Sequence, residues 1–185
     1  MPRDLKSPVW DIHDEYRTVR LNVKYYESLL SRTERCNFVV EFMLAATASG
    51  SGLAALSYLQ SGVGKDVWGG LTACAAVLAV AKPLFKWTER IKHLEGLAAG
   101  YRLLDHGYRQ LEVTLNEENT CSESSRQRFH SLLEQAAALD AKYPPLPLDR
   151  RLRARLSGEV DTELPSSRFF VPEVLRHDND QGKTS

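Results

Sequence analysis

The sequence lacks the residue spacings that hold a metal ion or form a disulfide framework. Its three cysteines, Cys36, Cys74 and Cys121, are far apart, and its five histidines are scattered. Zinc sites need cysteines or histidines separated by about two to five residues. Acidic residues surround His13, but no second histidine stands at ligand spacing, so a solvated helix start is the better interpretation. We expect no metal, no cofactor and reduced cysteines.

The sequence also has no excess of charge of either sign. Lys and Arg together number 24, and Asp and Glu together also number 24. A neutral chain creates no overall field that attracts nucleic acid, so no nucleic-acid partner is expected. The one basic cluster holds Arg150, Arg151, Arg153 and Arg155. It is either a site for anionic lipid or nucleic acid, or a plain solvated face of a helix.

Catalytic motifs are missing as well. The segment 61–66 reads Ser-Gly-Val-Gly-Lys-Asp, but a phosphate-binding loop needs a glycine five residues before Gly64 and a hydroxyl residue after Lys65. Leu59 and Asp66 occupy those positions, so the segment is interpreted as a turn. The sequence has no nucleophile elbow and no dinucleotide fingerprint. We therefore expect that the protein is not an enzyme.

Two runs without charge dominate the middle of the sequence. The first, Phe42–Gly64, has 23 residues, and a helix of that length rises about 34 Å, which exceeds the roughly 30 Å hydrocarbon core of a bilayer. The second, Val67–Ala81, has 15 residues and reaches spanning length only if it continues to Phe85 while Lys82 extends toward the headgroups. The runs predict a transmembrane helical hairpin with spans at about 38–62 and 67–85.

A soluble bundle with two buried helices is the alternative interpretation of these runs. Both runs are rich in Ala, Gly, Ser and Thr, which contribute little transfer free energy. Neither run has an amphipathic stripe, which favours the membrane. Small residues four apart favour it too, because they let transmembrane helices approach closely. The candidate helix-packing residues are Gly50, Gly52, Gly69 and Ala73.

Four polar residues of the hairpin are candidates for lining a pore. Thr47, Ser51 and Tyr58 share one face of the first span, and Glu41 is the acidic residue at its edge. Such residues either bond to backbone and neighbouring helices or line water. A two-helix hairpin encloses no channel by itself, so conduction requires a ring of protomers.

Amphipathic helices are predicted on both sides of the hairpin. The first starts at Pro8 and continues without a breaker toward the first span. After the second span, a stripe of apolar residues runs from Trp87 to Leu115 at steps of three and four. The stripe contains three glycines, Gly96, Gly100 and Gly107, which allow a neighbour to pack closely. A last helix covers 129–143, and the chain is predicted to be all-α, with a helical bundle beside the membrane.

Charge around the spans predicts the topology. Lys and Arg are frequent before the first span and after the second, whereas the turn offers only Lys65, offset by Asp66. The positive-inside rule then places both termini in the cytoplasm. Residues 1–148 are predicted to form the two-transmembrane domain, and residues 149–185 a basic segment with a mobile tail from Gly158.

The layout resembles a known family. A helix precedes two spans joined by a very short turn, Lys82-Pro-Leu-Phe-Lys86 follows the second span, and the next helix contains Tyr101-Arg-Leu-Leu-Asp105 and Tyr108-Arg-Gln-Leu-Glu112. Over roughly 9–143 this is similar to the SLATT family, the SMODS- and SLOG-associating two-transmembrane effectors of bacteria. The family has no catalytic motif, so no functional residue carries over.

The resemblance implies a function. Such a protein is expected to be a multi-pass protein of the bacterial inner membrane that forms homo-oligomeric pores, or otherwise perturbs the bilayer, in antiviral defence. A nucleotidyltransferase or a SLOG-type sensor is the partner expected to trigger it. The alternative is a soluble or membrane-tethered helical interaction module without transport activity.

Overall fold

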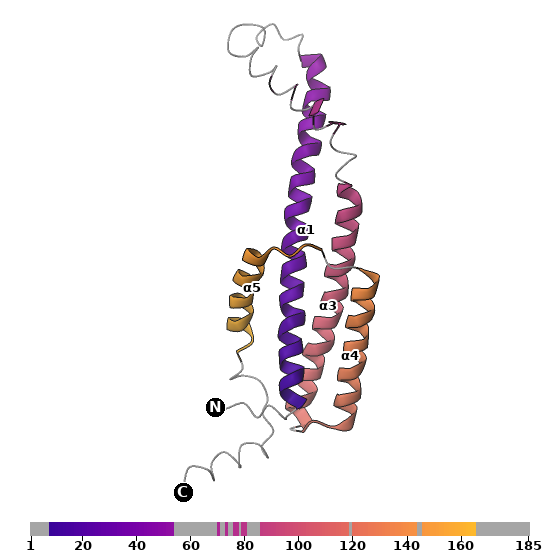
Figure 1. Ribbon diagram of the computed structural model, residues 1–185, viewed down its shortest axis with the longest axis vertical. Helices are drawn as coiled ribbons and strands as arrows, with labels where there is room; N and C mark the ends of the chain where they lie inside the picture. Colours follow the sequence, from indigo (N-terminus) through magenta and orange to yellow (C-terminus); the bar gives the residue numbers. More distant parts are fainter. Residues whose placement is uncertain are drawn as a thin grey trace. The chain divides into compact units, whose positions relative to one another are not determined.

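The computed structural model describes residues 8–53, 70, 73, 76–77, 79–80, 86–118, 120–143 and 146–165. Four helices are assigned there: α1 (Pro8–Leu53), α3 (Trp87–Glu118), α4 (Glu123–Lys142) and α5 (Arg150–Glu163) (Figure 1). The described part of the chain is all-helical, which confirms the predicted fold class. In α1, 46 residues form one helix from Pro8, as the lack of a breaker predicts.

The chain divides into two units. Unit 1 contains Met1–Glu27 and Glu95–Ser185, and unit 2 contains Ser28–Leu94. The described elements of unit 1 are the first part of α1, most of α3, and all of α4 and α5. Unit 2 holds the remainder of α1 and the start of α3.

The core of unit 1 combines the predicted apolar stripe of α3 with apolar residues of α1, α4 and α5. Its buried side chains are Val9, Ile12, Tyr16, Val19, Val23, Tyr25 and Tyr26 of α1, Leu97, Ala98, Tyr101, Leu104, Tyr108, Leu111 and Leu115 of α3, Leu132 of α4, and Leu156 and Val160 of α5. Steps of three and four place such residues on one face of a helix. Burying these faces against one another supplies the main driving force for folding of the bundle.

Tyrosines join the helices of this core. The rings of Tyr16 and Tyr108 stack with centroids 6.0 Å apart, and those of Tyr26 and Tyr101 stack at 5.4 Å, so both pairs link α1 to α3. Tyr108 also meets Phe129 of α4 edge-on at 6.2 Å. Aromatic pairs in these arrangements contribute about 0.5–1.5 kcal/mol beyond the area they bury. The contacts confirm that the stripe of α3 packs on α1 and on α4.

Three glycines of α3 make room for α4, as their positions in the stripe predict. A Cβ atom added to Gly96 would lie 2.5 Å from the ring of Tyr143, and one added to Gly100 would lie 2.3 Å from Leu139. At Gly107 the added atom would lie 2.6 Å from Leu132. All three distances are too short for carbon atoms in contact, so a side chain at these positions forces α4 or its residues to shift.

Gly107→Ala should therefore lower the free energy of unfolding by about 1–2 kcal/mol. Overpacking against the buried Leu132 costs about 1–3 kcal/mol, and the better helix propensity of Ala recovers up to about 1 kcal/mol. Gly158→Ala in α5 is the control, since a Cβ there meets nothing within 4 Å, and it should stabilise by about 0.5–1 kcal/mol. Urea unfolding of both variants tests this. If both substitutions changed the free energy of unfolding in the same direction, the close approach of Gly107 to Leu132 would be contradicted.

Helix α5 extends further than the sequence suggests. A mobile tail is predicted from Gly158, but α5 continues through Gly158 to Glu163. The Asp149 carboxylate accepts hydrogen bonds from the backbone N–H groups of Arg151 and Leu152, both at 3.1 Å. Leu156 and Val160, four residues apart, bury one face of the helix. Two apolar residues make too weak a periodic pattern to predict from sequence; packing within unit 1 decides the helix.

The predicted membrane spans are described only in part. The first, 38–62, coincides with α1 as far as Leu53, and its remainder, the turn and most of 67–85 lie outside the described residues. Among the residues that the structure describes, no helix combines the length and the apolar character needed to cross a membrane.

Candidate functional site

The candidate pore-lining residues are only partly described. Glu41 is exposed, and its Oε1 accepts a hydrogen bond from Asn37 Nδ2 at 3.2 Å, one turn earlier in α1. Thr47 and Ser51 belong to the helical backbone of α1, but their side chains lie outside the described part, as does all of Tyr58. Only the Glu41 side chain lies within the described residues, so a shared pore-lining face of these four residues stays a prediction.

The candidate helix-packing residues have a similar status. Gly50 and Gly52 lie within the helical backbone of α1. Ala73 is helical and exposed, and Gly69 lies outside the described residues. Close helix packing through these residues stays a prediction.

Unit 2 exposes large apolar side chains in two places. Phe38, Val39 and Phe42 of α1 are 68%, 58% and 62% exposed, and the rings of Phe38 and Phe42 lie 6.3 Å apart. Val77 and Val80 are 69% and 72% exposed. Single exposed apolar residues are ordinary, whereas large contiguous apolar patches are typical of surfaces that contact a partner or a membrane. Both groups fall inside the sequence ranges of the predicted spans.

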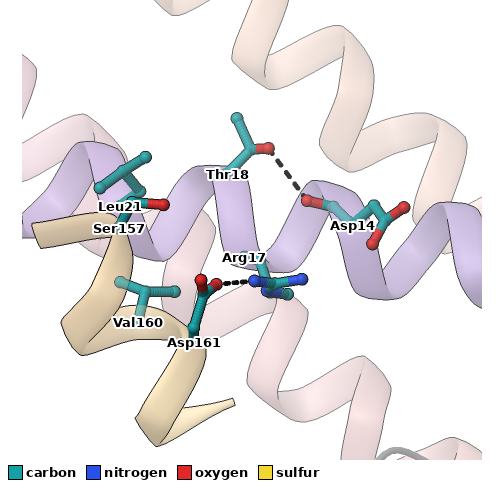
Figure 2. A pocket seen from close by; sticks show the side chains of 7 residues that line it. All are labelled: Asp14, Arg17, Thr18, Leu21, Ser157, Val160 and Asp161. Atoms are coloured by element: carbon teal, nitrogen blue, oxygen red, sulfur yellow. Dashed lines mark hydrogen bonds and ion pairs between the residues drawn. The ribbon is translucent and has the colours of Figure 1, made fainter. Parts of the chain in front are cut away.

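Unit 1 contains an ion-pair cluster that sequence reasoning missed. Three basic residues of α1, Arg17, Arg20 and Lys24, pair with three acidic residues of α5, Glu159, Asp161 and Glu163. Arg17 pairs with Asp161 and Lys24 with Glu163 (Figure 2 shows the first pair). Arg20 Nε lies 3.3 Å from a Glu163 oxygen. The signal was present: the basic residues are three and four apart in sequence, as are neighbours on one helix face.

A small pocket lies beside this cluster, between α1 and α5 (Figure 2). Its volume is about 230 Å³, and it is lined by Asp14, Arg17, Thr18, Leu21, Ser157, Val160 and Asp161. The Thr18 hydroxyl donates to the backbone oxygen of Asp14 at 2.9 Å, and the Arg17 guanidinium is already paired. Ligand pockets occupy about 300–1,000 Å³. The pocket is thus best interpreted as a gap in the packing of α5 on α1.

The ion pairs of α5 predict a pH dependence. A hydrogen bond from Lys24 is the main reason that the pKa of Glu163 lies below its usual 4.5. A carboxyl group with a lowered pKa in the folded state stabilises the fold above its unfolded pKa, and this contribution disappears as the pH falls through the folded value. Glu163→Gln should thus cost up to about 1 kcal/mol at pH 7, the range for exposed pairs, and less at about pH 3, where the carboxylate is being protonated. Urea unfolding at both pH values measures this.

Glu134 provides the control for this experiment. It is exposed and forms no ion pair in the described part of the chain, so Glu134→Gln should change stability little at either pH. An equal cost of Glu163→Gln at both pH values would show that the Glu163 side chain acts through packing instead of charge.

The α1–α3 interface also contains polar groups with perturbed pKa values. Asp105 Oδ2 accepts from Arg20 Nη1 at 3.1 Å, whereas its buried Oδ1 has no hydrogen-bond partner among the described residues. Burial raises the pKa of Asp105 despite Arg20. Burial also raises the pKa of Tyr16 and of Tyr108 to about 12. Both phenols therefore stay neutral at physiological pH, which suits packing and not proton transfer.

Metal-binding geometry is not found in the described residues: no three His, Cys, Asp or Glu side chains there could hold an ion together. The interpretation of a solvated helix start is wrong for His13, which is buried in unit 1 because it shares a face of α1 with Val9 and Tyr16. Cys36 and Cys121 are free thiols. No family model, no curated protein and no solved structure matches the chain. The resemblance to the SLATT family accordingly stays a prediction.

Proposed function

We propose that this chain is a membrane effector, whose 38–85 segment inserts into the bilayer as a helical hairpin and assembles with other copies into a pore. The observation that carries the proposal is the exposure of Phe38, Val39, Phe42, Val77 and Val80. Water-exposed apolar groups of this size cost free energy that burial in lipid recovers. The charge pattern around the spans supports cytoplasmic termini and a short external turn.

Unit 1 is the regulatory part in this proposal. Its four-helix packing provides a stable body that a nucleotidyltransferase or SLOG-type sensor can recognise. A partner that binds one packing of this bundle more tightly than another shifts the population between them. The pore then opens in the bacterial inner membrane and impairs the host cell, as the resemblance to defence effectors implies.

Leakage from liposomes tests the pore. The full chain, reconstituted into vesicles loaded with a fluorescent dye, should release the dye, and Thr47→Leu with Ser51→Leu should reduce the release, because both changes replace hydroxyl groups that face water in the assembled ring. Cross-linking and alkaline extraction verify that the variant still inserts and assembles. Unchanged leakage would show that both hydroxyl groups serve helix packing and do not line the pore.

A helical interaction module without transport activity is the second candidate. It is supported by unit 1, whose described helices bury apolar side chains against one another. The same vesicles distinguish the two functions. Insertion and cross-linking of the wild-type chain without any dye release would favour the interaction module over the pore.

A further inference from the structure

A second cleft in unit 1 lies between α3 and α4, away from the ion-pair cluster. Its volume is about 420 Å³, within the usual range of ligand pockets of about 300–1,000 Å³. The lining consists of His106, Arg109, Gln110, Val113 and Thr114 of α3 and Arg128 of α4. The lining thus contains two arginines and no carboxylate, unlike the pocket beside α5.

The two arginines of the cleft form no ion pair with a carboxylate of the described residues. Arg109 forms no ion pair or hydrogen bond within the described part of the chain, and Arg128 forms one hydrogen bond, to Gln110. The charge of Arg109 lowers the pKa values of Glu112 and Asp105, although burial raises them more strongly. Neither carboxylate lines the cleft, so the residues of its wall carry two positive charges and no negative one.

Side-chain hydrogen bonds hold part of this wall in place. Arg128 donates to the Gln110 side-chain oxygen, which ties α4 to α3. The amide nitrogen of Gln110 lies 2.9 Å from His106 Nε2, and a neutral imidazole accepts this bond. Only one donor of Arg128 is used, and all those of Arg109 remain open. The cleft therefore presents guanidinium donors that form no hydrogen bond within the described residues, and the hydrogen bond to Gln110 holds Arg128 in position.

We propose that the α3–α4 cleft binds a phosphate group carried by a small organic molecule. Guanidinium groups present planar pairs of donors that match phosphate oxygens, and a phosphate monoester brings about two negative charges to balance both arginines. Val113, which is 50% exposed, adds an apolar patch beside them. This patch favours an organic phosphate over the inorganic ion.

Titration calorimetry with two probes tests the site. The full-length chain is titrated with phenyl phosphate and with inorganic phosphate at low salt. Phenyl phosphate should bind, and more tightly than inorganic phosphate. Arg109→Ala combined with Arg128→Ala should weaken binding of phenyl phosphate by about tenfold or more, because each lost charge-assisted hydrogen bond contributes that order of affinity.

The chain offers a matched control. Arg150 and Arg151 of α5 are also exposed arginines without an ion pair in the described residues. Replacing both with Ala removes the same charge from a helix surface without the cleft. This variant should bind phenyl phosphate within about twofold of wild type, since the site depends on the cleft and not on net charge. Circular dichroism verifies that both double variants keep their helices.

Vesicles distinguish a soluble ligand from a lipid headgroup. Vesicles of phosphatidylcholine with and without phosphatidic acid are sedimented with the wild-type and cleft variants, and the readout is the additional binding that phosphatidic acid causes, because the proposed hairpin binds both kinds of vesicle. If the cleft variants lose binding to phenyl phosphate but not to phosphatidic acid, the ligand is a soluble phosphate ester. Cleft-dependent binding to phosphatidic acid as well supports a phospholipid headgroup. Absence of binding to every probe, or equal weakening by the cleft and α5 variants, would overturn the proposal.

Discussion

Replacing Leu104 with Asp should lower the free energy of unfolding of unit 1 by about 3–5 kcal/mol. Leu104 is 2% exposed in the stripe of α3, so the new carboxylate would be buried without a partner. Folded domains are stable by only about 5–15 kcal/mol, so the loss is large enough to unfold much of the population. Urea unfolding, followed through the near-ultraviolet signal of the core tyrosines, measures it.

Leu103→Asp is the control, because it places the same charge one residue away. Leu103 is 74% exposed, and surface substitutions change stability by about 0.5 kcal/mol or less. A large cost for Leu103→Asp, or a small one for Leu104→Asp, would show that α3 faces the core with a different side.

In cells, toxicity lost from an inserted Leu104→Asp variant would mean that unit 1 transmits the trigger, whereas constant toxicity would mean that it restrains the pore.

Phe42→Asp should remove a large share of the protein from the membrane fraction. Phe42 is 62% exposed beside Phe38, and it lies within the first proposed span. Phe favours insertion by about 0.3–0.6 kcal/mol, whereas Asp at a helix centre opposes it by about 2.5–3.5 kcal/mol. Because Phe42 lies next to Glu41 near the edge of the span, the sum of about 3–4 kcal/mol is an upper limit, and it corresponds to a partition shift of at most about a thousandfold. Fractionation of cells with quantitative blotting measures the shift.

The comparison again uses Leu103→Asp, an exposed leucine of unit 1 that receives the same charge. Its membrane fraction should equal that of the wild-type chain, because unit 1 is not proposed to enter lipid. If Phe42→Asp also stays fully in the membrane fraction, the exposed apolar residues of α1 serve another purpose, such as contact with a partner protein.

Most of the bundle can be predicted from the sequence because periodic patterns are strong over long helices. The stripe from Leu97 to Leu115 is fully buried, and the glycines within it, Gly100 and Gly107, lie against α4. Pro8 begins α1, and α4 ends just before Pro144. In each case the feature depends on local spacing or on backbone chemistry, which the sequence contains directly.

Features that depend on contacts distant in sequence are predictable only in part. The spacing of Arg17, Arg20 and Lys24 shows that they share a helix face, but it does not show which carboxylates they meet. Helix α5 has only Leu156 and Val160 to bury, and ion pairs with Arg17, Arg20 and Lys24, more than 130 residues earlier, add to its attachment. The α3–α4 cleft likewise needs Arg109 and Arg128 to meet across two helices. The candidate pore residues were predicted from composition and spacing in a segment that the structure describes only in part.

Alkaline carbonate extraction of membranes from cells that produce the full chain tests membrane insertion most directly. High pH strips peripheral proteins and opens membranes into sheets, whereas helices that span the bilayer stay with the lipid because their apolar surface remains buried. We predict that the wild-type chain remains in the membrane pellet. Recovery of the chain in the carbonate supernatant would contradict the hairpin and the pore together.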